Sequence, residues 1–154
     1  LYGKVQVTAL QLPNAMSPVP AGSVDMVLTF RNLHNWMARE GAATAMLKAM
    51  YDALKPGGIL GVVDHRANPA LPPDASAKSG YVNEQQAVDL VKSVGFEYLG
   101  SSEVNANPKD TKDYEQGVWT LPPTYRLGDK DRARYAAIGE SDRFTLKFRK
   151  PLAK

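Results

Sequence analysis

The segment Ser23–Arg66 decides the fold: it begins SVDMVLTFRNLHNWM and ends LKPGGILGVVDHR. Val24–Phe30 is a nearly continuous apolar run, which is typical of a strand covered on both faces in a parallel sheet. Ala42–Leu54 repeats apolar residues at helical spacing, and Pro56-Gly57-Gly58 ends that helix. Ile59–Val63 is a second buried strand. The segment therefore predicts one parallel strand–helix–strand unit.

Three further elements are predicted after this unit and one before it. Lys4–Thr8 alternates between polar and apolar residues and predicts a short strand. Asn83 with Gln86 three residues later resembles a capping box, and the helix it opens is followed by a third parallel strand at Phe96–Gly100. Phe144–Arg149 alternates cleanly and predicts a strand with one exposed side.

Composition narrows the class of protein. The chain has 154 residues, enough for one domain with a real core, so residues 1–154 are taken as a single domain. Its 19 basic and 16 acidic residues are interspersed, which argues against a nucleic-acid surface. There is no cysteine, and no apolar run approaches the ~20 residues of a membrane-spanning helix. We expect a cytoplasmic protein, with the periplasm left open because the chain starts at Leu1 and is interpreted as truncated.

Several short sequence segments resemble the carboxyl-terminal portion of a class I S-adenosylmethionine-dependent methyltransferase. Asp25 opens the first strand, the LKPGG turn at Leu54–Gly58 precedes the second, and SVGFEYLG at Ser93–Gly100 leads into the third. WTLPPTYR, at Trp119–Arg126, is similar to a bacterial group of predicted methyltransferases. The resemblance implies an α/β, Rossmann-like sheet of parallel strands. It also implies a final antiparallel strand beside the third strand, after a long insertion at 101–142.

The same resemblance implies S-adenosylmethionine as the cofactor, with Phe30, Arg31 and Asn32 on the cofactor side of the site. The chain departs from the family in three places. It contains no Gly-x-Gly-x-Gly turn, and it lacks the acidic residue that the family places at the end of its second strand for the cofactor ribose. Thr8-Ala9-Leu10 also lacks the acidic residue that many members place there for the adenine. The 154-residue chain by itself is therefore expected to bind the cofactor poorly and to be inactive.

Polar residues at two strand ends are the candidate catalytic groups. His34 follows the first strand, and Asp64 and His65 follow the second. Because neighbouring parallel strands end at the same sheet edge, these side chains are expected to face one crevice. His34 is the candidate base, since its ordinary pKa lies near neutrality. The alternatives are that His34 caps the helix or packs against Trp36. For Asp64 the alternatives are a salt bridge to Arg66 and a cap on the following turn. No metal signature is matched, and no metal is expected.

Candidate substrate contacts come from two segments, one after the first strand and one in the insertion. They are Asn35, Trp36, Trp119, Tyr125 and Arg126. Because the third strand also ends at the ligand edge, the insertion 101–142 emerges there and is interpreted as a possible lid over a small-molecule substrate.

The predicted function is methyl transfer from S-adenosylmethionine to an unidentified, small-molecule acceptor. The alternative is a non-catalytic binding or assembly module on the same scaffold, favoured by the missing Gly-rich turn. A nicotinamide-dependent dehydrogenase is a third option, and it too requires an upstream Gly-rich turn. Since the first apolar strand forms a sheet edge, a homodimer through that edge is also expected.

Overall fold

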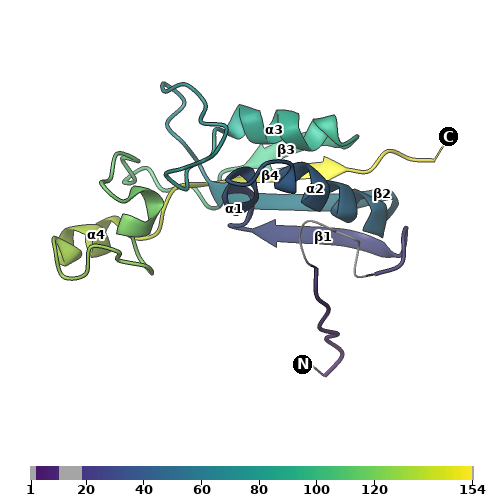
Figure 1. The fold of residues 1–154 in the computed structure, drawn as a ribbon, viewed down its shortest axis with the longest axis horizontal. Helices are drawn as coiled ribbons and strands as arrows, with labels where there is room; N and C mark the ends of the chain where they lie inside the picture. The colour runs from purple at the N-terminus through teal and green to yellow at the C-terminus, as the bar shows by residue number, and fades with distance from the viewer. Residues whose placement is uncertain (1–2, 11–18, 154) are drawn as a thin grey trace.

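The computed structural model describes residues 3–10 and 19–153 and contains one four-stranded sheet (Figure 1). The strands, in their order across the sheet, are β1 (Val24–Phe30), β2 (Leu54–His65), β4 (Arg143–Arg149) and β3 (Glu97–Ser102). β1 and β2 are parallel, whereas β4 runs antiparallel to both β2 and β3. The final strand thus lies between the second and third parallel strands, and this confirms the predicted fold class.

Two helices form where the sequence predicts them, at Ala42–Ala53 and Glu84–Ser93, and three short ones form in segments for which no helix is predicted. They are α1 (Leu33–Met37), α2 (Ala42–Ala53), α3 (Glu84–Ser93), the short 3-10 helix η1 (Gly117–Thr120) and α4 (Arg132–Ile138). The predicted cap of α3 is present, because the Asn83 side chain accepts a hydrogen bond from Gln86 N at 3.0 Å. None of the helices in the described ranges is long and apolar enough to cross a membrane.

The hydrophobic core lies between one face of the sheet and the helices α1, α2 and α3. Leu60 and Val62 of β2 are cross-strand partners of Phe148 and Leu146 of β4, and all four side chains are at most 1% exposed. Leu47 of α2 packs into the same cluster. Burial of this apolar surface is the main stabilising contribution that the fold supplies.

The opposite face of the sheet is open along most of its length. Met26, Leu28 and Phe30 of β1 are 55%, 55% and 57% exposed, so the prediction that this strand is covered on both faces was wrong. The reason is topological: α1, α2 and α3 all pack on the other face, where Val27 and Thr29 of β1 point.

Two boundaries also differ from the sequence prediction. No strand forms at Lys4–Thr8, where Val5 and Val7 are exposed, because this segment pairs with none of the four strands. β2 begins at Leu54 rather than Ile59, so the Gly-Gly turn is part of an irregular strand whose register with β1 shifts between Val24 and Met26.

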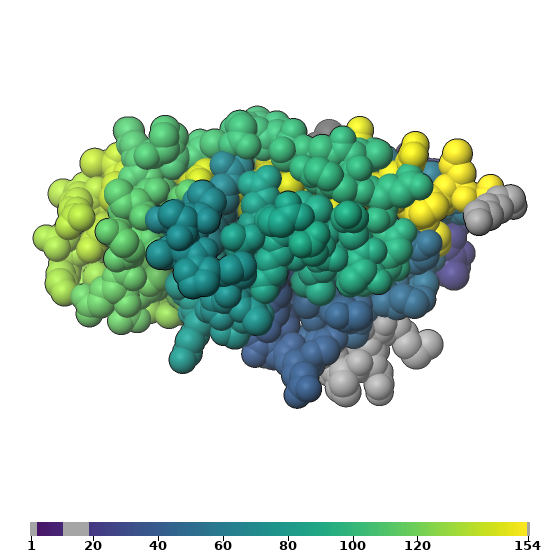
Figure 2. All heavy atoms as spheres, turned by 90° about the horizontal axis from the view of Figure 1, so that it is seen from above, coloured from purple at the N-terminus to yellow at the C-terminus, as the bar shows by residue number. Residues whose placement is uncertain are grey.

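The insertion between β3 and β4 forms the end of the molecule at which β1 and β2 terminate (Figures 1 and 2). Val118 N donates to the carbonyl of Ser79 at 2.9 Å, and a Cβ added to Gly117 would lie 2.1 Å from that same oxygen. Gly117 also has a φ of +56°, a region that favours glycine. The insertion is therefore packed directly against the loop that precedes α3.

Candidate active site

The carboxyl ends of β1 and β2 meet at the site, and they bring together His34, Asp64 and His65. His34 lies in the first turn of α1, two residues after the loop that leaves β1, while Asp64 and His65 are the last residues of β2. All three are buried, with Asp64 completely inaccessible to solvent. Burial along β2 alternates as far as Val62, but its last four residues are all buried, so both faces of the sheet are covered only here.

Asp64 is held by three hydrogen bonds. Its Oδ2 accepts from the backbone N–H of His34 at 3.0 Å, and its Oδ1 accepts from the backbone N–H of His65 at 2.8 Å. Oδ1 also lies 2.9 Å from Nδ1 of the His34 ring. The carboxylate thus caps the start of α1, where the Asn32 side chain makes no capping bond, and orients the first histidine.

The hydrogen bond between the ring and the carboxylate determines which nitrogen of His34 is available for chemistry. Because a carboxylate accepts, Nδ1 is the donor, and Nε2 keeps its lone pair. His34 lines a cavity of about 330 Å³ at this edge of the sheet, whereas Asp64 lies behind it. A side chain held in this way by a buried carboxylate is suited to accept a proton from a group bound in the cavity.

His65 is the second imidazole of the site, and its ring centroid lies 5.2 Å from that of His34. Its Nδ1 is 2.5 Å from Oγ of Ser141, the residue two positions before β4. Burial lowers the pKa of His65 to about 4, against the opposing influence of Asp64. His65 is therefore neutral at physiological pH.

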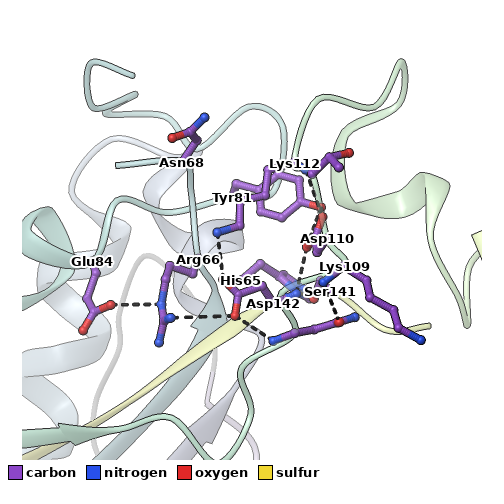
Figure 3. A network of polar contacts seen from close by, with 12 residues as sticks. His65, Arg66, Asn68, Tyr81, Glu84, Lys109, Asp110, Lys112, Ser141 and Asp142 are labelled. Atoms are coloured by element: carbon purple, nitrogen blue, oxygen red, sulfur yellow. Dashed lines mark hydrogen bonds and ion pairs between the residues drawn. The ribbon is translucent and has the colours of Figure 1, made fainter. Parts of the chain in front are cut away.

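A network of buried polar groups anchors the insertion behind His65 (Figure 3). The Tyr81 hydroxyl donates to Asp110, whose carboxylate also accepts from the backbone N–H groups of Lys112 and Asp142 at 3.0 and 2.8 Å. Lys112 Nζ lies 2.7 Å from the Asp142 carboxylate. Burial opposes ionisation of Asp142, but its contacts with Lys112 and its other donors leave the pKa of that carboxyl below its usual value. The insertion is thus tied to the sheet at the residue next to Ser141.

Arg66 belongs to this network and not to Asp64. Its guanidinium pairs with Glu84 at 3.0 Å and Glu103 at 2.8 Å, and it lies 3.8 Å from Asp142. The alternative explanation of Asp64 as a salt-bridge partner of Arg66 was therefore wrong, since the donors to Asp64 come from the two histidine residues.

The cavity contains some of the predicted contact residues and not others. The predicted residues that line it, besides the two histidines, are Phe30, Arg31, Asn32, Asn35 and Trp119. Trp119 meets His34 edge to face, with ring centroids 6.0 Å apart. Trp36 packs against the hydrophobic core instead, and Tyr125 carries the guanidinium of Arg132 over its ring at 3.9 Å. Arg126 stacks on the Trp119 ring at 4.6 Å and is absent from the cavity lining.

Sequence reasoning missed the residues that the chain contributes just before its last strand. Glu140 and Ser141 line the cavity, and Ser141 holds His65. A signal was present: β4 is antiparallel, so the residues before its first position lie at the same edge as the ends of β1 and β2. Pro122, Pro123 and Thr124 also line the cavity; they lie inside the WTLPPTYR segment, of which the sequence analysis selected only Trp119, Tyr125 and Arg126 as contacts.

Arg31 is the strained residue of the site. Its φ is +56°, which is uncommon for a residue with a side chain and often marks a functional position. Its backbone N–H donates to the carbonyl of Val63 at 2.8 Å, so the strain is stabilised by the neighbouring strand. Within the described residues its guanidinium has no ion pair or hydrogen bond, and it lines the cavity beside Phe30 and Asn32. These three residues are available to one end of a cofactor, whereas the chain contains no Gly-x-Gly-x-Gly turn for the rest.

The strand order and the position of the cavity define the class of fold to which the chain belongs. The chain has the fold of class I S-adenosylmethionine-dependent methyltransferases, with its cavity at the carboxyl ends of the strands, where ligands bind in open α/β sheets.

Solved structures of similar fold support this class. The crystal structure of the cyclase SpnF has a TM-score of 0.60 at 19% identity, covering 88% of this chain and 54% of SpnF. A methyltransferase from Methanosarcina mazei has a TM-score of 0.52 at 14% identity, covering 87% of this chain and 62% of that protein. The 1,6-didemethyltoxoflavin-N1-methyltransferase of Burkholderia thailandensis, solved with bound 1,6-didemethyltoxoflavin and S-adenosylhomocysteine, has a TM-score of 0.51 at 14% identity, covering 86% of this chain and 46% of that protein.

The likeness extends to the fold and no further. No protein-family model and no curated protein matches the chain. The chain spans roughly half the length of the three structures described above. Because one of them is named a cyclase, the fold by itself does not specify the reaction.

Proposed function

We propose that the protein transfers a methyl group from S-adenosylmethionine to an oxygen or nitrogen of a small molecule, with His34 as the general base. The observation that supports this most directly is the His34 ring, fixed by Asp64 at 2.9 Å and lining the cavity at the strand ends. The fold, shared with S-adenosylmethionine-dependent methyltransferases, supports the choice of cofactor.

The chemistry required of the protein is modest. S-adenosylmethionine supplies an already activated methyl group, so alignment of the acceptor provides much of the rate. The side chains of Phe30, Arg31 and Asn32 would hold the cofactor's methionine end. His34 Nε2 takes the proton that the acceptor loses as its new bond to the methyl carbon forms, while Asp64 stabilises the resulting imidazolium. Trp119 and Asn35 form the adjoining wall, where the acceptor would lie.

The test is His34→Gln in the whole protein, assayed by formation of S-adenosylhomocysteine with a panel of hydroxyl and amine acceptors. We expect the rate to fall by roughly 10²- to 10⁴-fold, the usual contribution of a general base. Binding of S-adenosylhomocysteine, measured by calorimetry, is expected to stay unchanged. Lys48→Gln, on the exposed surface of α2, is the matched control. A His34→Gln protein with wild-type turnover would sink the base assignment.

A second function remains a candidate on one observation. A structure of the same fold is named a cyclase, so the scaffold also supports a function without methyl transfer, such as that of a ligand-binding module. For the 154-residue chain by itself we expect weak cofactor binding and no turnover. Calorimetry of this chain with S-adenosylhomocysteine checks that expectation, and tight binding would contradict it.

A further inference from the structure

The chain has two histidines and no cysteine, and the fold brings both histidines to its completely buried carboxylate. His34, Asp64 and His65 each offer one ligand atom, and these atoms all lie within 4.8 Å of one another. Across residues 3–10 and 19–153 no other group of three such side chains comes together. Both imidazoles of the chain therefore lie beside the same carboxylate, in the lining of the cavity.

We propose that this cluster binds a divalent transition-metal ion through one ring nitrogen of each histidine and one carboxylate oxygen of Asp64. Two imidazoles and a carboxylate suit zinc and its neighbours in the first transition row, and not the hard ions magnesium and calcium. Three protein ligands leave a fourth tetrahedral position open. Since His34 and His65 both line the cavity, the open position faces it.

The geometry is close to what such an ion requires. Ligand atoms at 2.0–2.1 Å from a tetrahedral ion are about 3.4 Å apart. His34 Nδ1 lies 2.9 Å from Asp64 Oδ1, and His65 Nε2 lies 4.0 Å from that same oxygen, so one separation is somewhat short and the other somewhat long. All three ligand atoms lie within 4.8 Å of one another, so the cage is completed by rotations of the side chains that bring these atoms to the tetrahedral spacing.

The surroundings of His65 favour its role as a ligand. Ser141 Oγ contacts Nδ1 at 2.5 Å, which leaves Nε2 directed at the Asp64 side; outer partners of this kind fix ring orientation in metal sites. The positive charges of Arg31 and Arg143 act on His65 and weaken cation binding, while Asp64 supplies the compensating charge. We therefore expect an affinity below that of a structural zinc site.

This inference is independent of methyl transfer, but it has a consequence for it. An ion on His34 Nδ1 moves the ring proton to Nε2, and an ion on Nε2 occupies the lone pair directly. In both cases His34 can no longer accept a proton from an acceptor. The metal-bound protein is therefore expected to be inhibited in the proposed reaction.

The test is a titration of the full chain with Co²⁺ alone, in the absence of cofactor and acceptor, followed by visible absorption and by NMR of the imidazoles. With two histidines in the chain, both signals are readily assigned. We expect one Co²⁺ per chain, with both imidazole signals shifting together. His65→Gln and Asp64→Asn are expected to weaken binding at least about 10-fold. Asp89→Asn, an exposed carboxylate on α3, is the matched control and is expected to bind as the wild type does.

Three results would overturn the proposal: no binding at millimolar Co²⁺, equal binding by wild type and His65→Gln, or a shift of one imidazole alone. If Asp64→Asn fails to fold, as judged by circular dichroism, His65→Gln decides, because it leaves the cap of α1 in place. Since no turnover is measured, a negative titration leaves the methyl-transfer proposal intact. Conversely, an inactive His34→Gln enzyme does not by itself support a metal.

Discussion

The two faces of the sheet carry similar apolar residues but differ strongly in solvent exposure. On the face under α1, α2 and α3, the side chains of Leu60 and Leu146 are at most 1% exposed. On the other face, Leu28 of the neighbouring strand is 55% exposed. The same kind of residue thus occupies both faces, and the difference is whether an element of the described chain covers it. An apolar pattern shows which side chains gain from burial, but it does not show what buries them.

The open face is covered at one end, and that end is the candidate site. Val63 and His65 are each 8% exposed, whereas Phe30, the partner of Val63 on β1, is 57% exposed. Residues of the insertion, including Glu140 and Ser141, lie beside them. The insertion therefore covers the open face of the sheet only at the end where the polar side chains of the candidate site lie.

The largest effect is expected from Leu60→Ala on the covered face. The substitution removes buried methyl groups and leaves a cavity between β2 and the helices, so the free energy of unfolding is expected to fall by about 2–5 kcal/mol. Urea denaturation measures this change. A loss under about 1 kcal/mol would mean that the two faces are energetically alike and would break the comparison.

The next effect tests the covered end of the open face through pH. His65 has a folded pKa of about 4 against an ordinary value of 6.5, so the unfolded chain binds the proton first as pH falls. Stability from this group is present above pH 6.5 and is lost between 6.5 and 4, by up to about 3 kcal/mol. The measurement is the difference in unfolding free energy between wild type and His65→Gln across that window. A difference that does not vary with pH would show that His65 is not desolvated.

A somewhat smaller effect is expected where the insertion is anchored. The Asp110 carboxylate accepts hydrogen bonds from Tyr81, Lys112 and Asp142. In Asp110→Asn the side-chain N–H₂ group replaces one of the two oxygens, so at least one of these donors faces another donor. We expect a loss of about 1–3 kcal/mol in thermal or urea unfolding. Asp113→Asn, an exposed carboxylate in the same segment, is the control and is expected to change stability by under about 0.5 kcal/mol. Equal effects of the two substitutions would contradict the anchoring role.

The smallest effect is expected on the open face itself. Leu28→Ala is expected to cost under about 0.5 kcal/mol at low protein concentration, because the side chain is already half in solvent. The predicted homodimer gives this residue a second readout: at high concentration the wild type should self-associate, and Leu28→Lys should not. Light scattering distinguishes the two states. A wild type that stays monomeric at every concentration would remove the dimer from consideration.

Much of the fold was predictable because its signals are local. The apolar run of β1, the cap at Asn83 and the alternation of Phe144–Arg149 each specify an element within a few residues. The exposure of one face of β1 was not predictable in this way, because it depends on the face of the sheet against which the helices pack. The predicted strand at Lys4–Thr8 does not form for a related reason: a segment with an alternating pattern becomes a strand only when a partner strand pairs with it.

The site was predictable where it follows strand ends and not where it depends on packing. His34, Asp64 and His65 come together because two parallel strands end at one edge, which topology alone requires. That Ser141 holds His65, and that Trp36 packs into the core while Trp119 lines the cavity, depends on the path of the insertion. Such contacts span many residues, 76 positions in the case of His65 and Ser141, and no local pattern records them.

Asp64 has a consequence beyond orientation of a ring. Its two oxygens accept hydrogen bonds from the first turn of α1 and from the last residue of β2. The carboxylate therefore links the beginning and the end of the connection from β1 to β2. A chain in which that crossover is mispaired by one residue presents no carboxylate to His34. The contact between the His34 ring and this carboxylate therefore forms only in molecules whose crossover has closed correctly, and its presence reports on the quality of folding.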